Sequence, residues 1–191
     1  GVSGLSLAAQ LAKAEPGTPW PKHVQKFADA GAQMLVYDVD GDGLADVITA
    51  WHCHHYGLVW HKQVRSASGE VSWQQNVILP PEPDLKSDAL RFSQPHALDL
   101  VDMNGDGLKD VLTGKRFWAH GPKGDKEPNA PAVVYWFELR RDKNQNVQFI
   151  PHKIDDNSGV GTQVAAADLN GDGLPDVIVG NKKGIFLNFS G

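Results

Sequence analysis

Aspartates crowd one short stretch of the chain, YDVDGDGLADV at residues 37–47, where four of them fall within nine positions. Like charges this close repel one another unless a cation neutralises them. Oxygen ligands at positions 1, 3 and 5, a backbone carbonyl at 7 and a carboxylate at 9 suit Ca²⁺. The spacing therefore predicts a calcium loop with the ligands Asp38, Asp40, Asp42, the carbonyl of Leu44, and Asp46.

The same pattern occurs twice more, as LVDMNGDGLKDV and AADLNGDGLPDV. The first ligand positions, Asp38, Asp102 and Asp168, are spaced by 64 and 66 residues, and a glycine at position 6 permits the sharp turn around an ion. A metal-free Asx-rich turn is the alternative, but threefold recurrence favours a metal. The predicted ligands of the later loops are Asp102, Asn104, Asp106, Leu108, Asp110, Asp168, Asn170, Asp172, Leu174 and Asp176.

These loops are not EF-hands. An EF-hand needs a glutamate at position 12 between two helices, and that position holds Thr49, Thr113 and Val179. Each loop is followed by a β-branched run (DVITA, DVLTG or DVIVG), which is typical of a strand. The sequence therefore predicts a strand on each side of every loop.

Each repeat contains enough strand-like runs for a four-stranded unit, with the calcium loop between its first and second strands. Four-stranded units that repeat along a chain are typical of β-propeller blades, so we expect an all-β fold of about three blades. The segment 18–27 precedes the first unit and is predicted to be the outer strand of an earlier or closing blade, which could complete the third. The expected strands are 34–37, 45–53, 57–64, 71–79, 97–101, 109–118, 132–141, 147–154, 164–167, 175–183 and 184–190.

Loops and strands together resemble the FG-GAP/VCBS repeat family, which includes integrin-α-like propellers, over most of residues 20 to 190. The resemblance implies about three structural Ca²⁺ ions and a secreted or periplasmic protein. It does not fix a function, because the family hosts adhesion, sugar binding and catalysis. Propellers usually have four to eight blades, so we expect either part of a longer propeller or a homodimer.

The first residues raise a question of processing. Residues 1–14 are rich in small and apolar side chains and end in Ala12-Lys13-Ala14, which is similar to a signal-peptide cleavage site. We expect a signal-peptide remnant or an N-terminal extension over residues 1–19, with a short amphipathic helix as the alternative, and the propeller segment over 20–191.

Blade strands alternate in direction, so the loops 51–57, 115–131, 181–184, 80–96 and 155–163 should share the face opposite the calcium loops. Their cations and aromatic side chains suit a carbohydrate, above all an acidic sugar, or a protein ligand. The alternative is a solvated rim with aromatics packed between blades. The ligand-binding candidates are His52, His54, Lys115, Arg116, His120, Gln163 and Lys182.

The run HCHH, from His52 through Cys53 and His54 to His55, is a second candidate site on this face. Imidazole and thiolate ligands could hold Zn²⁺ or Cu²⁺, with a further ligand from His96 or His120. On a strand, His52 and His54 would share one side and Cys53 and His55 the other. The alternative is a buried cysteine that packs as a small hydrophobe.

Binding or scaffolding is the function we expect first. The alternative is a polysaccharide or sugar lyase or dehydratase, in which His96 with Asp155 would remove a proton next to a carboxylate.

Bulk composition restricts the partners. A net charge of −5 argues against a nucleic-acid partner, and no apolar run approaches the roughly 20 residues of a membrane span. The single cysteine excludes an internal disulfide.

Overall fold

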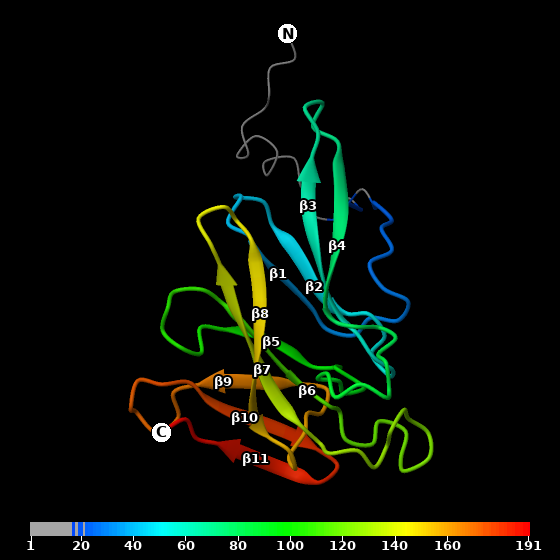
Figure 1. Ribbon diagram of the computed structural model, residues 1–191, viewed down its shortest axis with the longest axis vertical. Coiled ribbons are helices and arrows are strands. Elements are labelled where there is room, and N and C mark those ends of the chain that lie inside the picture. Colours follow the sequence, from blue (N-terminus) through cyan, green and yellow to red (C-terminus); the bar gives the residue numbers. More distant parts are fainter. Residues whose placement is uncertain (1–16, 18, 21) are drawn as a thin grey trace.

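The computed structural model describes Gly17, Pro19, Trp20 and residues 22–191 of the chain, and every regular element among them is a β-strand (Figure 1). The predicted N-terminal extension therefore lies almost entirely outside the described residues. The strands form three antiparallel sheets, ordered β1-β2-β3-β4, β5-β6-β7-β8 and β9-β10-β11. Their bounds are β1 Met34–Tyr37, β2 Asp46–Ala50, β3 Leu58–Arg65, β4 Val71–Leu79, β5 Leu98–Val101, β6 Asp110–Gly114, β7 Val134–Arg141, β8 Val147–Asp155, β9 Val164–Ala167, β10 Asp176–Asn181 and β11 Gly184–Asn188.

The three sheets are arranged as successive propeller blades. The first strands of the sheets lie side by side, β1 next to β5 and β5 next to β9, and the later strands follow outward in chain order. In Figure 1 the blue-cyan, green-yellow and orange-red sheets follow one another in the same way. The all-β fold and the division into blades are confirmed.

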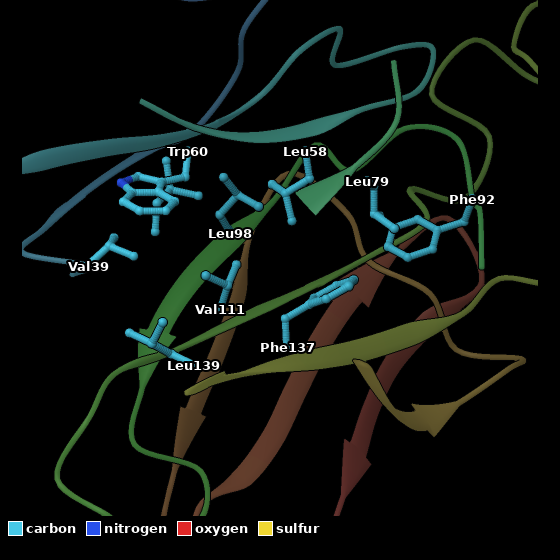
Figure 2. Close-up of a cluster of buried hydrophobic side chains, with 10 residues drawn as sticks. Val39, Leu58, Trp60, Leu79, Phe92, Leu98, Val111, Phe137 and Leu139 are labelled. Atoms are coloured by element: carbon cyan, nitrogen blue, oxygen red, sulfur yellow. The ribbon is translucent and has the colours of Figure 1, made fainter. Parts of the chain in front are cut away.

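Two apolar clusters hold neighbouring blades together. The first blade contributes Leu58 and Trp60 to a cluster with Val111 and Phe137 of the second (Figure 2). On β6 the next side chain, Leu112, points to the other side of the sheet and packs in a second cluster with Val177 and Val179 of the third blade. The middle blade is therefore covered on both faces, and every residue of β6 is buried.

The predicted strand over 18–27 is not a strand in the described residues, and it does not complete the third blade. Phe27 instead packs on the outer side of the first blade, with its ring centroid 5.0 Å from that of His61 and 4.9 Å from that of Trp73. The prolines at 19 and 21 remove two backbone donors that a sheet strand would use, which gives a physical reason for the wrong prediction.

Some strands end earlier than the sequence indicated. The strand expected over 45–53 ends at Ala50, and the amide of Trp51 donates to the carbonyl of Gly57, 2.9 Å away, which closes a tight loop. The strand expected over 109–118 ends at Gly114. Candidate residues therefore stand on loops rather than on strands. Among the described residues, no helix has the length and apolar character needed to cross a bilayer.

Candidate calcium loops and the opposite loop face

The first aspartate of each calcium loop organises the turn. Asp38 accepts hydrogen bonds from the amides of Gly41, at 2.8 Å, and Gly43, at 3.0 Å. Asp102 and Asp168 bind the two glycines of their own loops in the same way. All six glycines have φ between +77° and +87°, a region that residues with a side chain seldom adopt. The loops therefore share one backbone conformation.

Oxygen atoms converge inside the first loop. Ligand oxygens of Asp38, Asp40 and Asp42 all lie within 4.8 Å of one another. A calcium ion binds oxygens at about 2.3–2.6 Å, so one ion can reach all three. In the later loops an asparagine replaces the second aspartate. Its side-chain amide donates a hydrogen bond to the aspartate at position 5, from Asn104 to Asp106 and from Asn170 to Asp172. The oxygen donors of all three loops are of the kind that Ca²⁺ takes, and their convergence is shown for the first loop.

A lysine side chain from the neighbouring strand contacts the carboxylates of the first loop. The Lys62 ammonium, from β3, contacts Asp40 and lies 3.0 Å from a carboxylate oxygen of Asp42. The hydrogen bond to Asp40 raises the pKa of Lys62. By strand register, the equivalent residue beside the second loop is Glu138, which pairs with Arg140 and His152 instead. The Lys62 ammonium thus contacts carboxylates that would bind Ca²⁺ and would compete with the ion. Among the described residues, only the first loop has such a lysine.

The last aspartate of each loop also accepts hydrogen bonds from outside the loop. Both oxygens of Asp46 accept hydrogen bonds, from the Val39 amide and the Trp60 indole on one side and the Gln63 amide on the other. Burial raises the pKa of Asp46 and of Asp110. These carboxylates tie the loop to the third strand of the blade, in addition to any role as a ligand. The corresponding donors are Met103 and Leu139 for Asp110, and Leu169 and Ser190 for Asp176.

The histidine-rich segment 51–57 is a compact turn, so the predicted strand alternation is wrong. The amide of His55 donates to the carbonyl of His52 at 3.0 Å, and the two imidazole rings stack with centroids 4.1 Å apart. His52 and His55 therefore share a side, while Cys53 and His54 turn toward another loop.

His54 joins three loops of this face. Its ring centroid lies 4.5 Å from that of His120, on the β6–β7 loop, and 5.5 Å from that of His96, on the β4–β5 loop. The buried Cys53 thiol is the third member of a close group with His54 and His96. Burial raises the pKa of the thiol and lowers that of His96 to about 4, so the His96 imidazole is neutral at pH 7.

Two of the predicted ligand-binding residues, both with positively charged side chains, line a hollow between the second and third blades. Arg116 and Lys182 line a space of about 160 Å³ together with Phe117 and Trp118, whose rings stack at 4.8 Å. Lys182 donates to the carbonyl of Ala119 at 3.2 Å, which holds its ammonium at this site. The arrangement offers two positive charges beside an aromatic surface.

Two other candidates lie elsewhere. Lys115 is 1% exposed, and its ammonium donates to the Ser93 hydroxyl, 2.5 Å away, and to the Lys126 carbonyl at 3.3 Å. Gln163 is exposed and lines a different hollow on the outer side of the third blade. The structure thus gathers most of the predicted residues at two places and leaves these two apart.

The predicted base and acid of the alternative function do not form a pair. One oxygen of Asp155 accepts hydrogen bonds from Ser158, amide and hydroxyl, and from the Asn157 amide, so this carboxylate closes the turn after β8. Burial raises its pKa, but these hydrogen bonds outweigh that effect and lower it. Among the described residues, His96 and Asp155 share no hydrogen bond.

Sequence reasoning missed Asp125. Its fully buried carboxylate accepts hydrogen bonds from the backbone amide and from Nδ1 of His120, both at 2.9 Å. The spacing of the two residues in HGPKGD, on a loop rich in turn residues, is a signal that could have indicated a local pair.

The comparisons with known proteins agree with the repeat pattern. Residues 102–179 match the model of the FG-GAP-like repeat family, a span that runs from the first aspartate of the second loop into β10. The comparison with curated proteins gives no match. FG-GAP-like repeats form propeller blades, in accord with the three sheets. Residues 102–179 of this chain are therefore similar to FG-GAP-like repeats.

Proposed function

We propose that this chain is a calcium-stabilised propeller segment that acts as a binding module. The calcium loops lie on one face and fix the turns between the first two strands of each blade. The loops that carry Arg116, Lys182 and the histidines lie on the other face. This division supports a metal-fixed scaffold that presents a separate binding surface.

The ligand we propose is an acidic carbohydrate. The observation that carries the proposal is the hollow in which Arg116 and Lys182 flank the stacked rings of Phe117 and Trp118. A guanidinium group can bind a carboxylate through two hydrogen bonds, and an aromatic face can pack against the apolar side of a sugar ring. A uronic acid offers both features in one unit.

A secreted or periplasmic location accompanies this proposal. Calcium sites of extracellular modules can have dissociation constants of roughly 10⁻⁴–10⁻³ M, which suits the calcium levels outside the cytoplasm. The proposed location thus rests on the calcium loops and not on the N-terminal residues.

Isothermal titration of the calcium-loaded protein with an oligogalacturonate tests the ligand proposal. We expect binding that weakens with added salt, and about tenfold weaker binding in Arg116→Ala and in Lys182→Ala, which corresponds to about 1.4 kcal/mol. Lys143→Ala, an exposed lysine on the β7–β8 turn, is the control and should bind as the unaltered chain does. Equal binding of a neutral maltooligosaccharide, or full binding by both hollow variants, would contradict the proposal.

A further inference from the structure

We propose a zinc site on the face opposite the calcium loops, with Cys53, His54, His96 and His120 as its ligands. The four side chains come from three loops that are distant in sequence, β2–β3, β4–β5 and β6–β7. None of its four ligands is a residue of the calcium loops or of the Arg116–Lys182 hollow, so its existence does not depend on the proposed function.

The distances suit one small ion. Ligand atoms of Cys53, His54 and His96 all lie within 4.8 Å of one another, and so do those of His54, His120 and Asp125. In a tetrahedral zinc site with bonds of about 2.0–2.3 Å, neighbouring ligand atoms are roughly 3.3–3.8 Å apart. The two groups share His54, and the side chains would have to move closer together to bind one Zn²⁺.

Asp125 is positioned to orient His120 as a zinc ligand. An ionised carboxylate only accepts hydrogen bonds, so Nδ1 of His120 must donate to it, and Nε2 then carries the free lone pair. The same carboxylate fixes the His120 backbone through its amide. Carboxylate–histidine pairs of this kind fix the tautomer and direction of histidine ligands at metal sites.

Buried polar atoms around the group have no partner among the described residues. Nδ1 of His54 and Nδ1 of His96 are two of them. Gln94, two residues before His96, is fully buried with both side-chain amide atoms unpaired, and its φ is +61°. An unpaired buried polar group is costly, and strained residues concentrate at functional sites, so the group has the features of a site prepared for a ligand.

The chemistry of the group selects zinc over calcium. A thiolate and imidazoles are preferred by Zn²⁺, whereas Ca²⁺ takes oxygen ligands. The Arg116 guanidinium lies near enough to influence Cys53 and His96 and opposes an added cation. The Cys53 thiolate and the Asp125 carboxylate supply two negative charges that offset it.

The test measures metal in the full chain, purified without a histidine tag, stripped with chelator, and dialysed against Zn²⁺ and Ca²⁺ together. We expect one tightly held zinc per chain by elemental mass spectrometry. Substitution by Co²⁺ should give the intense visible bands of tetrahedral cobalt and a thiolate charge-transfer band.

Variants assign the ligands. Cys53→Ser should remove the thiolate charge-transfer band, and His96→Ala should lose stoichiometric zinc. Asp125→Asn, which leaves all four ligands in place, should weaken zinc binding about 10–100-fold. The matched control is His152→Ala, which should keep its zinc. His152 lies on β8 and pairs with Glu138. Circular dichroism of each variant separates loss of zinc from loss of folding.

Three outcomes would overturn the proposal. They are a folded protein that holds no zinc, equal zinc loss in His152→Ala, or cobalt spectra without a thiolate band. The calcium content, measured in the same samples, separates this result from the proposed function. Three calcium ions without zinc would contradict only the zinc site, and zinc without calcium would contradict only the calcium-stabilised module.

Discussion

Lys115 shows how a single residue can limit the stability of a blade. Its side chain is 1% exposed, and burial lowers the pKa of its ammonium to about 8. The unfolded chain keeps the ordinary pKa of about 10.4 for this lysine. Between these two values the unfolded state binds more protons than the folded state, so the free energy of unfolding rises with pH in that window.

The first prediction replaces this lysine by an apolar side chain of similar length, Lys115→Met. Between pH 8 and 9.5 the native lysine should add about 2 kcal/mol to the free energy of unfolding, and the variant should lack this rise. Urea unfolding at the two pH values measures the difference between the two proteins. The exposed Lys143→Met is the control, and an identical pH dependence in Lys115→Met and the unaltered chain would refute the burial effect.

Lys62 makes the first calcium loop different from the other two, because its ammonium already forms ion pairs with the carboxylates of Asp40 and Asp42. Calcium must displace this group. We predict that Lys62→Gln raises the calcium affinity of the first loop by about tenfold, or about 1.4 kcal/mol. Calcium titration followed by calorimetry should show the weakest of three binding steps become stronger, with Lys143→Gln unchanged. A titration unaffected by Lys62→Gln would show that the ammonium does not compete.

At the scale of elements, each calcium loop is attached to its blade by the last aspartate. Asp110 is fully buried and accepts hydrogen bonds from the amides of Met103, in the loop, and Leu139, on β7. Both are proposed calcium ligands, but Asp102 bonds only within its own loop. The two carboxylates should therefore fail in different ways when they are altered.

The third prediction compares Asp110→Asn with Asp102→Asn. The first variant turns an acceptor into a donor that faces a backbone amide, so it should lose about 1–3 kcal/mol both with calcium and in excess EDTA. Asp102→Asn should lose most of its stability difference once calcium is removed from both proteins. Thermal unfolding in the two buffers measures this. Equal behaviour of the two variants would contradict the separate roles.

The elements themselves could largely be predicted from the sequence. Turn residues and β-branched runs indicated the strands and the loop backbone, because glycine and strand propensities act locally. The wrong predictions concern the loops. Alternation along His52–His55 is wrong because the chain turns after Ala50, and segment 18–27, expected as the outer strand of an earlier or closing blade, is not a strand among the described residues. The use of Asp110 as a tie between strands depends on β7, about thirty residues away, so local spacing could not show it.

At the scale of the whole molecule, the two outer blades each leave an apolar side open. On the third blade, Ile178, Ile185 and Leu187 point away from the second blade and are exposed. On the first blade, Met34 and Val36 are exposed beside the segment that carries Phe27. Apolar rows of this kind on neighbouring strands are usually covered by another surface.

We predict that the purified chain associates with itself through these outer blades. A head-to-tail contact of two copies would bring three blades of each into one ring of six, within the usual four to eight. Analytical ultracentrifugation over a range of concentrations should show dimer formation. Ile185→Lys with Leu187→Lys should shift the equilibrium to monomer, while Leu85→Lys, at an exposed leucine of the β4–β5 loop, serves as the control. A monomer at every concentration would contradict this prediction.

The central claim of the account is that calcium holds the three loops and thereby the blades. Its most direct test is a thermal unfolding curve recorded with millimolar calcium and again with excess EDTA, combined with the calcium bound per chain at equilibrium dialysis against millimolar calcium. The account predicts about three calcium ions per chain and a lower melting temperature in EDTA, because an ion that binds only the folded state stabilises it. A melting curve that is unchanged by chelation, from a chain that holds no calcium, would contradict it.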